Sequence, residues 1–424
     1  MEHPATKPEQ YRALGLSTFA FTVCFATWTL FSILGIRISD DLGLSGTQLG
    51  LLMATPILSG SISRVFLGIW TNRYGGRRVL GMLMLITAAC VYLLTFAKNY
   101  PMLLLGALGL GLAGGSFIVG ASYTAAWYEP SKQGVALGIF GAGNVGAAIT
   151  SLAAPLLLLA VGWEKTAQIY AAVLALSGAL FTLLAKDDPE TAQHAKAQVP
   201  SLPERAAPLK ELQVWRFGLY YFFVFGGFVA LALWLPHYLM GVYGLPLQAA
   251  GAVAALFIIP ASLFRALAGW LANRYGARRL MYSALIISVA CTFLLSYPPT
   301  EYVVHGTEGD IRFSLTTVLP MFMVIIFILG LSMSVGKAAV YNHIPVYYPN
   351  HVGVVGGVVG MIGGLGGFVL PLGFGVLKDI TGIWQSCFML MFSVVTAALI
   401  WMHFAIRKAE RVEWAANEER TDLP

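Results

Sequence analysis

The chain has 424 residues, of which 58% are hydrophobic and only 11% carry a charge, and its mean hydropathy is +0.74. A soluble domain carries roughly 25% charged residues, so the composition excludes a soluble globular protein and predicts one that crosses a membrane many times. The net charge of +6 indicates orientation in a lipid bilayer and affinity for its headgroups, not binding to nucleic acid.

Apolar stretches of spanning length, which is roughly 20 residues, follow one another in two sets of six. This arrangement is typical of two homologous bundles. We expect an all-α membrane protein with an N-terminal bundle at 1–185, a cytoplasmic linker at 186–213, and a C-terminal bundle with a cytoplasmic tail at 214–424. The expected spans are 15–37, 47–70, 79–97, 102–127, 133–161, 166–185, 217–240, 247–271, 280–296, 316–346, 352–377 and 384–406.

The Lys and Arg residues that lie outside these spans or at the last residue of a span are unevenly distributed. Eighteen of them lie on the side that holds both termini, and five lie on the other side. Because positive residues stay preferentially on the cytoplasmic side, both termini are expected to be cytoplasmic.

One segment of fifteen residues occurs twice, with an offset of 201 residues. Residues 64–78 read RVFLGIWTNRYGGRR and residues 265–279 read RALAGWLANRYGARR, so eight positions match. A repeat of this kind indicates an internal duplication. In each copy an apolar helix is expected to end at a glycine, Gly75 or Gly276, with a pair of arginines just beyond it.

Three basic residues, Arg64, Arg265 and Lys337, fall inside spans, whereas all 20 acidic residues fall in loops or tails. Arg64 precedes Arg73 by nine residues, or about 13 Å of helix, in a hydrocarbon core roughly 30 Å thick. If Arg73 lies at the surface, Arg64 lies near the midplane. A cation there costs about 2.5–3.5 kcal/mol or more and usually faces a cavity.

The two arginines are therefore predicted to bind an anion. Alternatively, each caps carbonyls of a broken neighbouring helix or reaches back to the membrane surface. For Lys337, bonding to backbone carbonyls is the corresponding alternative.

Glycines three and four residues apart line spans 5 and 11, in segments 134–146 and 353–367. Such faces let helix backbones approach closely. The pattern predicts helix packing, and beyond it a face that slides against its neighbours during gating and exposes the Asn144 amide to a small ligand. The glycines assigned to gating and packing are Gly138, Gly141, Gly143, Gly146, Gly360, Gly363, Gly364 and Gly366.

Aromatic residues lie near the same depth. Phe117 follows two glycines in span 4, and Tyr221 and Phe225 are one helical turn apart in span 7, so they share a face. Aromatic residues in a membrane helix commonly belong to the core. At the junction of two bundles, their flat rings can also enclose a flat anion.

The repeated turn resembles the loop 2–3 signature of the major facilitator superfamily, although Asn72 and Asn273 stand where the superfamily usually has Asp. Together with both span arginines, the two glycine segments resemble the nitrate/nitrite porter family. This resemblance covers nearly the whole chain. It implies a transporter of nitrate, or nitrite, in a bacterial inner membrane, with alternating access between two six-helix bundles.

Carried over residue by residue, the resemblance implies that one arginine from each bundle clamps the anion. Two phenylalanine rings would lie above and below it, while a tyrosine and an asparagine would add hydrogen bonds. The implied substrate-binding residues are Arg64, Arg265, Phe117, Asn144, Tyr221 and Phe225.

Segments 17–26 and 336–341 resemble the nitrate/proton symporter branch of the family. The spans contain no Asp or Glu, so the usual carboxylate relay for protons is missing. Lys337 is therefore predicted to take up and release the coupled proton, because burial and like-charge repulsion both act against a charged amine. His343, six residues on, is predicted to pass that proton to water.

Several alternatives remain open. The chain can instead be a nitrate/nitrite antiporter, a carrier of carboxylates or other organic anions, an anion channel, or a membrane sensor. An enzyme is not expected, because no span carries a nucleophile and a base at useful spacing. No cofactor or metal site is expected, and the partners are the anion, protons and the lipid bilayer, with the chain acting as a monomer.

Overall fold

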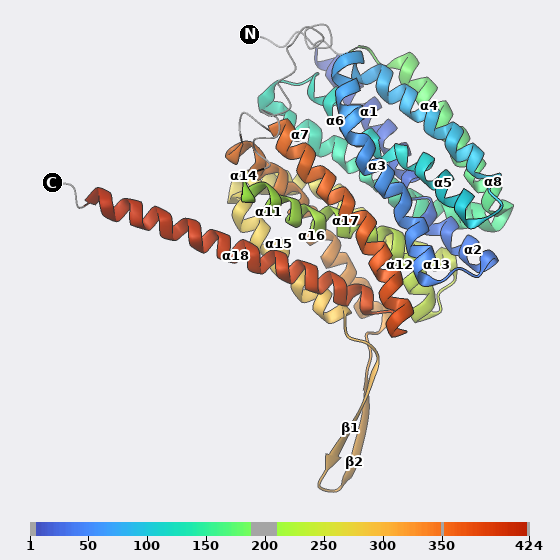
Figure 1. The fold of residues 1–424 in the computed structure, drawn as a ribbon, viewed down its shortest axis with the longest axis vertical. Helices are drawn as coiled ribbons and strands as arrows, with labels where there is room; N and C mark the ends of the chain where they lie inside the picture. Colours follow the sequence, from blue (N-terminus) through green and yellow to red (C-terminus); the bar gives the residue numbers. More distant parts are fainter. Residues whose placement is uncertain (1–5, 188–209, 349–351, 422–424) are drawn as a thin grey trace.

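The computed structural model describes residues 6–187, 210–348 and 352–421, and in these ranges it is a bundle of long helices (Figure 1). The predicted linker at 186–213 falls mostly on 188–209, outside the described residues. Ten helical segments among the described residues are long and apolar enough to span a membrane. One of them, Lys132–Leu184, has 53 residues and turns at Gly162, so it crosses twice. With the 29-residue helix that carries Arg64, the described chain makes twelve crossings.

The first half of the chain contains six crossings. Its elements are α1 (Lys7–Trp28), α2 (Phe31–Leu42), α3 (Gly46–Tyr74), α4 (Gly76–Leu94), α5 (Tyr100–Gly111), the 3₁₀ turn η1 (Leu112–Gly115), α6 (Ser116–Ala125), α7 (Pro130–Gly141), the 3₁₀ turn η2 (Ala142–Val145) and α8 (Gly146–Leu184). The fifth predicted span covers α7, η2 and the first part of α8, and the sixth is the remainder of α8; the two parts of α8 are separate helices that join at Gly162, which has φ 83°. Glycine adopts this φ without the steric cost that a Cβ brings.

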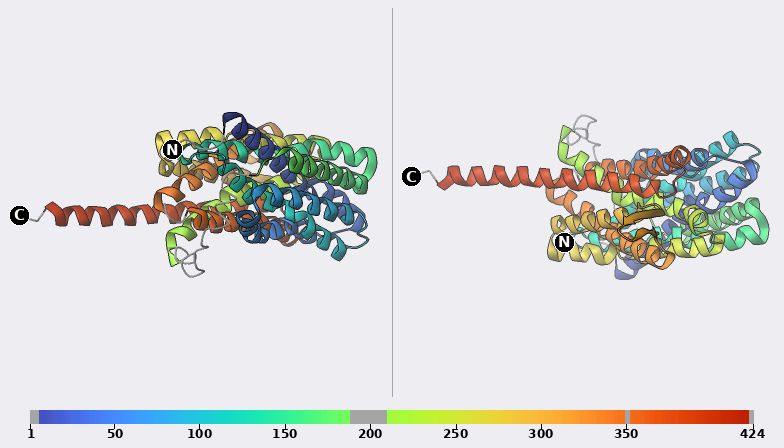
Figure 2. Two further views of the ribbon diagram at one scale, coloured as in Figure 1. Left: turned by 90° about the horizontal axis from the view of Figure 1, so that it is seen from above. Right: turned by 90° about the horizontal axis from the view of Figure 1, so that it is seen from below.

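The second half contains the other six crossings. Its elements are α11 (Leu212–Tyr221), the π-helical segment η4 (Phe222–Gly227), α12 (Phe228–Tyr243), α13 (Leu247–Leu263), α14 (Arg265–Tyr275), α15 (Ala277–Leu295), β1 (Thr300–Gly306), β2 (Gly309–Leu315), α16 (Leu319–Tyr347), α17 (Val352–Thr381) and α18 (Ser386–Thr421). The elements of the two halves lie side by side in both perpendicular views (Figure 2).

The duplicated turn has the predicted form in both halves. Helix α3 ends at Gly75 and α14 ends at Gly276, with φ values of 85° and 87°. In the first half, Arg77 donates hydrogen bonds from Nε and Nη2 to the carbonyl oxygen of Thr182, at 3.0 and 2.9 Å. The basic turn is thereby tied to the end of α8.

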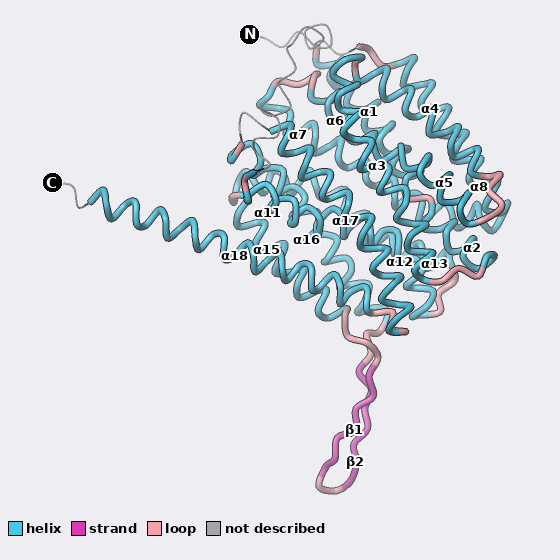
Figure 3. Tube along the Cα trace, in the orientation of Figure 1, coloured by secondary structure: helices cyan, strands magenta, loops and turns pink. Residues whose placement is uncertain are grey.

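Two differences from the predicted spans lie at the surface (Figure 3). Residues 297–315 were expected to be a loop, but β1 and β2 pair there as an antiparallel hairpin, from Thr300 opposite Leu315 to Gly306 opposite Gly309. Helix α18 continues as far as Thr421, well beyond the predicted span 384–406. We call the end of the molecule with the hairpin the hairpin end, and the end with the turns at Gly75 and Gly276 the basic-turn end.

The two halves contact each other mainly along two helix pairs, α3 with α17 and α8 with α13, and also where α7 meets α14 and α2 meets α12. Close backbone approach occurs toward the hairpin end. A Cβ at Gly50 would lie 2.5 Å from the carbonyl oxygen of Pro371, and one at Gly251 would collide with the carbonyl of Ser151. At both places only glycine permits this separation between the helices.

Three glycines nearer the basic-turn end have more room. A Cβ at Gly134, Gly269 or Gly357 would meet no neighbouring atom within 4 Å. Among the described glycines, tight contact between the halves is therefore concentrated toward the hairpin end.

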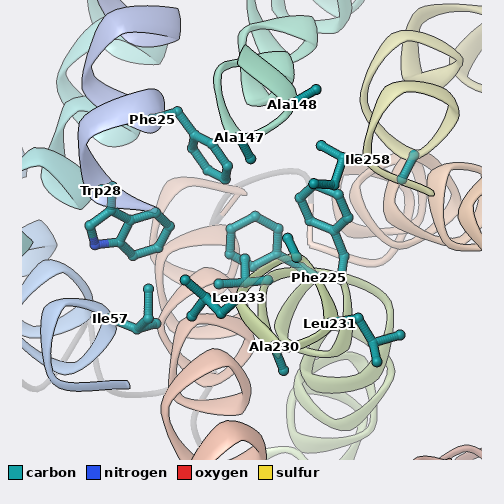
Figure 4. Packing of buried hydrophobic residues seen from close by; sticks show 14 of the residues in the cluster. Phe25, Trp28, Ile57, Ala147, Ala148, Phe225, Ala230, Leu231, Leu233 and Ile258 are labelled. Atoms are coloured by element: carbon teal, nitrogen blue, oxygen red, sulfur yellow. The ribbon is translucent and has the colours of Figure 1, made fainter. Parts of the chain in front are cut away.

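An apolar core joins the halves between these two ends. Figure 4 shows Phe25 and Trp28 of α1, Ile57 of α3, Phe225 of η4 and Ile258 of α13 gathered in one region. Each of them is buried, with at most 4% of its surface exposed. This core borders the helices that carry the intramembrane arginines.

Candidate functional site

The helices lose their regular α geometry where candidate site residues lie. The η1 turn contains Gly114, η2 contains Asn144, and the π-helical segment η4 contains Phe225. Span 8 is interrupted at Phe264, directly before Arg265. Departures of this kind re-aim side chains and free backbone carbonyls, and they occur frequently at functional sites.

The Arg64 side chain extends from α3 and contacts residues of both halves. Its Nε donates to the carbonyl oxygen of Gly114 in η1 at 3.3 Å, and its Nη1 donates to the carbonyl oxygen of Gly360 in α17 at 3.1 Å. The Cζ atom lies 5.9 Å from the ring centroid of Phe117 and 5.6 Å from that of Phe225. The guanidinium is thus contacted by a carbonyl oxygen and by aromatic rings from each half.

Arg265 approaches the same place from the second half. Its side chain is buried, and its Cζ lies 5.7 Å from the centroid of Phe117 and 5.8 Å from that of Tyr341. Its Nη1 atom is buried without a hydrogen-bond partner. An unsatisfied buried donor of this kind is costly.

Phe117 is the common neighbour of the two arginines. Its ring also packs against Phe21 and Phe140, at centroid distances of 5.6 and 5.9 Å. The structure therefore brings Arg64 and Arg265, from helices 201 residues apart in sequence, to the same aromatic ring.

The rings of Tyr221 and Phe225 stack at 5.1 Å with an interplanar angle of 8°, as expected for residues on one face. Tyr341 of α16 meets Tyr221 edge-on at 5.0 Å. In this cluster, the Phe225 ring lies beside the Arg64 guanidinium, and the Tyr341 ring lies beside the Arg265 guanidinium. One aromatic cluster of the second half therefore contacts both guanidinium groups.

Asn144 is fully buried in η2, and neither its Nδ2 nor its Oδ1 has a hydrogen-bond partner among the described residues. It follows Gly141 by three residues, and a Cβ at Gly141 would lie 3.2–3.3 Å from three atoms of the Arg265 side chain. Residues three apart lie on one side of a helix. The unsatisfied amide is thus one turn away from the place where α7 packs against Arg265.

Lys337 lies inside the second half of the bundle. It is fully buried, and its Nζ donates to the carbonyl oxygen of Ala261 at 2.7 Å and lies 3.7 Å from the ring centroid of Phe228. Lys337 and Arg265 interact electrostatically as like charges. None of the salt bridges found among the described residues includes either of them or Arg64.

His343 does not join this group. Its Nδ1 lies 2.9 Å from the carbonyl oxygen of Ala339, and its ring packs against Phe217 and Tyr347, at centroid distances of 5.6 and 6.0 Å. It lines a separate pocket between α11, α15 and α18. The structure therefore does not place His343 and Lys337 in contact.

The predicted gating glycines fall into two groups. Gly138 and Gly141 face α14, and Gly364 faces Ser61 of α3, so these three lie between the halves. Gly360 lies beside the Tyr341 hydroxyl, while its carbonyl accepts from Arg64.

The remaining four pack within one half. Gly143 and Gly146 face α1, while Gly363 and Gly366 face the Tyr221 ring and the backbone of η4. Part of the glycine pattern therefore serves packing within each half.

Sequence reasoning missed Trp28 and Tyr341 as parts of the site. Tyr341 lies one helical turn after Lys337, and this spacing could have indicated it. Trp28 lies 5.7 Å from the Cζ of Arg64 and is anchored by a hydrogen bond of 2.9 Å from its Nε1 to the carbonyl oxygen of Pro56. Nothing in the sequence distinguishes it from a core tryptophan, because its role depends on how α1 packs against α3.

The arrangement suits a small, flat anion. Guanidinium groups offer paired, coplanar donors to oxyanions and stay charged when buried. The aromatic rings restrict the space in which an anion can lie, and the Asn144 amide can add a hydrogen bond. No acidic side chain competes for the arginines among the described contacts.

The sequence is similar to a protein-family model and to several known proteins. A family model described as the Major Facilitator Superfamily matches residues 16–305 and 253–423. The chain is 41% identical to a probable nitrate/nitrite antiporter, NarK1, of Thermus thermophilus, over 95% of this chain and 93% of that protein. It is 30% identical to a nitrite extrusion protein of Bacillus subtilis, over 95% and 97%.

Solved structures show the same fold at lower identity. A bacterial homolog of the human lysosomal transporter Spinster, in an inward-facing and occupied conformation, superposes with a TM-score of 0.73 at 16% identity, over 95% of this chain and 98% of that one. The nucleoside transporter NupG superposes with a TM-score of 0.70 at 15% identity, over 92% and 99%. From the matched family model and the relatives at 41% and 30% identity, the chain belongs to the nitrate/nitrite porter family of the major facilitator superfamily.

Proposed function

We propose that this protein is a secondary transporter that moves nitrate, and nitrite as a related substrate, by alternating access. Arg64 and Arg265 bind the anion from the two halves, Phe117 and Phe225 enclose it, and Asn144 and Tyr221 add hydrogen bonds. The names of the relatives, which describe nitrate and nitrite transport, support this choice of substrate.

One observation carries the proposal. The guanidinium groups of Arg64, which is half-buried, and Arg265, which is buried, come from different halves and lie 5.9 and 5.7 Å from the centroid of one Phe117 ring. A bound anion at this place would contact both halves at once. It would also supply the acceptor that Arg265 Nη1 lacks, which offsets the cost of burying unpaired cations.

The unequal packing of the two ends supports alternating access. Glycine contacts press the halves together toward the hairpin end, whereas Gly134, Gly269 and Gly357 toward the basic-turn end meet no neighbour. This is the packing expected of a state closed at the hairpin end, in a cycle in which the two halves rock about the anion site.

We also propose that uptake is coupled to protons through Lys337. An anion entering a cell that is negative inside needs a co-transported cation, and the spans offer no carboxylate to carry a proton. Lys337 interacts with Arg265, so its charge bears directly on the anion site. His343 is the proposed exit for the proton at the basic-turn end, reached through intervening groups because it does not contact Lys337.

A second candidate is exchange of nitrate for nitrite without protons. The name of the Thermus thermophilus relative, a probable nitrate/nitrite antiporter, supports it. In both cases the basic-turn end faces the cytoplasm of a bacterial cell, with both termini there, as the distribution of basic residues favours. We further propose that the working unit is a monomer.

Reconstitution of the purified protein into liposomes tests the substrate and the coupling together. We expect saturable nitrate uptake that unlabelled nitrite inhibits and that acetate at equal concentration does not. A proton gradient, acid outside, should drive accumulation in liposomes that contain neither anion. Uptake only into nitrite-loaded liposomes would establish exchange, and no saturable nitrate flux in either case would exclude the proposed function.

A further inference from the structure

Two basic side chains meet at the hairpin end of the second half, away from the anion site. They are His237 of α12 and Lys378 of α17, and the Nζ of Lys378 lies 3.2 Å from the Nε2 of His237. Both side chains are half-buried. His237 follows Phe225 by twelve residues, which is about 18 Å of helix. The proposed anion binding uses neither member of this pair.

The ring of Trp384 lies against both members of the pair. Its centroid is 3.7 Å from the Nζ of Lys378 and 4.8 Å from the centroid of the His237 ring. The indole packs on α12 at Gly241, where a Cβ would collide with it. Because a cation beside the face of an aromatic ring is stabilised, the tryptophan favours a charged lysine at this place.

The contact has room for one proton between its two nitrogen atoms. A lysine ammonium can only donate, so the Nε2 of His237 accepts and the imidazole is neutral. A second proton, on Nε2, would bring two positive groups to 3.2 Å from each other. Like charges this close disfavour the doubly protonated pair. The arrangement in this structure therefore excludes a charged His237.

The charges around the pair do not remove this repulsion. Among the described residues, Lys378 is the one charged side chain that interacts electrostatically with His237, while Asp379 interacts with Lys378. Of the elements that pack on α12, η4 and α13 contain no charged residue. The charged residues and histidines of the others are Arg37, Asp40 and Asp41 of α2, Arg64 and Arg73 of α3, Lys337 and His343 of α16, and Lys378 and Asp379 of α17.

The pair lies on helices that contact the first half. Helix α12 packs on α2, and α17 packs on α3. The carboxylate of Asp379 accepts hydrogen bonds from the backbone N–H groups of Gly46 and Thr47, at the start of α3. When the halves part at the hairpin end, water reaches the pair and this carboxylate loses its donors. A carboxylate without partners favours additional positive charge beside it.

We propose that His237 and Lys378 form a proton-binding site that controls the opening of the hairpin end. The closed state holds the pair with one proton, and the open state accepts a second proton on His237. With the hairpin end outside, an acidic exterior favours the state that receives nitrate; this consequence rests on the proposed function, whereas the opening itself does not. The coupled proton remains assigned to Lys337, so the pair controls opening and not the extent of accumulation.

The size of the effect follows from the difference in proton binding between the two states. An exposed histidine takes up its proton at about pH 6.5, whereas the closed pair excludes it. Lowering the pH from 7.5 to 5.5 therefore shifts the balance toward the open state by up to about tenfold.

The test measures opening in the full chain in detergent, without nitrate. Spin labels at Leu42 and Val318, exposed positions on opposite halves, report the distance between the halves at pH 7.5 and at pH 5.5. In His237→Gln the new side chain can accept from Lys378 but cannot take up a proton. His305→Gln is the matched control, because that histidine is exposed in the hairpin at the same end.

We expect acidification to enlarge the population of long distances several-fold in the parent and in His305→Gln, and to leave it unchanged in His237→Gln. Lys378→Gln should also lose most of the response, because His237 can then be protonated in both states. A parent without a pH response, or a parental response in either pair variant, would overturn the proposal. A parent that opens at low pH but shows no nitrate flux in liposomes would support this site and contradict the proposed transport.

Discussion

The side chain of Arg265 packs against Gly141 of α7, which has no side chain of its own. A Cβ at Gly141 would lie 3.2–3.3 Å from the Cδ, Nε and Cζ atoms of Arg265, which is tighter than ordinary van der Waals contact. The glycine thus defines how far the guanidinium extends from α14 toward Phe117.

We expect Gly141→Ala to lower the affinity for nitrate about tenfold, because overpacking of this size costs roughly 1–3 kcal/mol and displaces the guanidinium. Gly134→Ala on the same helix is the control, since nothing lies within 4 Å of its Cβ position. Nitrate titration of both variants provides the measurement. If they bind nitrate equally well, the position of Arg265 does not depend on Gly141.

A substitution at Lys337 tests proton coupling separately from anion binding. Lys337→Gln should abolish the accumulation of nitrate on a proton gradient, because glutamine cannot exchange a proton, while nitrate exchange down its own gradient persists. Lys378→Gln is a matched control: that lysine also lies 3.7 Å from an aromatic ring, Trp384, but near the hairpin end. Should Lys337→Gln concentrate nitrate as the parent does, coupling lies elsewhere and the exchanger becomes the better description.

At the scale of elements, a helix end forms a latch between the halves. The carboxylate of Asp379, near the end of α17, accepts hydrogen bonds from the backbone N–H groups of Gly46 and Thr47 at 2.9 and 2.7 Å. It also accepts one of 2.6 Å from the Thr47 hydroxyl. Gly46 and Thr47 are the first residues of α3, so a negative charge caps the positive end of a helix in the other half.

Asp379→Asn should weaken this latch and shift the protein toward the state that is open at the hairpin end. The group is exposed and screened, and a charge at a helix terminus contributes about 0.3–1 kcal/mol, so a shift of a few-fold is expected. Spin labels at Leu42 and Val318, on opposite halves, report the change as a larger population of long distances. Asp40→Asn removes an exposed charge near the end of α2 and should leave that population unchanged, and an identical distribution for both variants would contradict the latch.

The elements that follow from local patterns were predictable, and those that depend on tertiary contacts were not. Hydrophobic runs indicated the spans, and the glycines at 75 and 276 correctly marked two helix ends. The π-helical segment at 222–227 was not predictable, because its apolar sequence is equally compatible with a regular helix. The hairpin was missed because its strands are short and exposed, so no buried face imposes an alternating pattern.

At the scale of the molecule, the repeat predicted that two arginines would meet at one depth, and the structure brings both to Phe117. Which glycines separate the halves could not be predicted, because glycines on both sides of a helix have the same spacing. The separation of Lys337 and His343, in contrast, follows from helix geometry, since residues six apart on one helix, here α16, differ by about 9 Å along the axis and face different sides.

The central claim is that two arginines, one from each half, bind the transported anion together. Its most direct test is the nitrate affinity of Arg64→Lys, Arg265→Lys and the double variant, measured by calorimetric titration of well-folded protein, with Arg279→Lys as the control. Lysine keeps the charge and loses the paired planar donors. We predict saturable binding by the parent and the control, a loss of about tenfold or more in each single variant, and no measurable binding in the double variant. Near-parental affinity in both single variants would contradict the account.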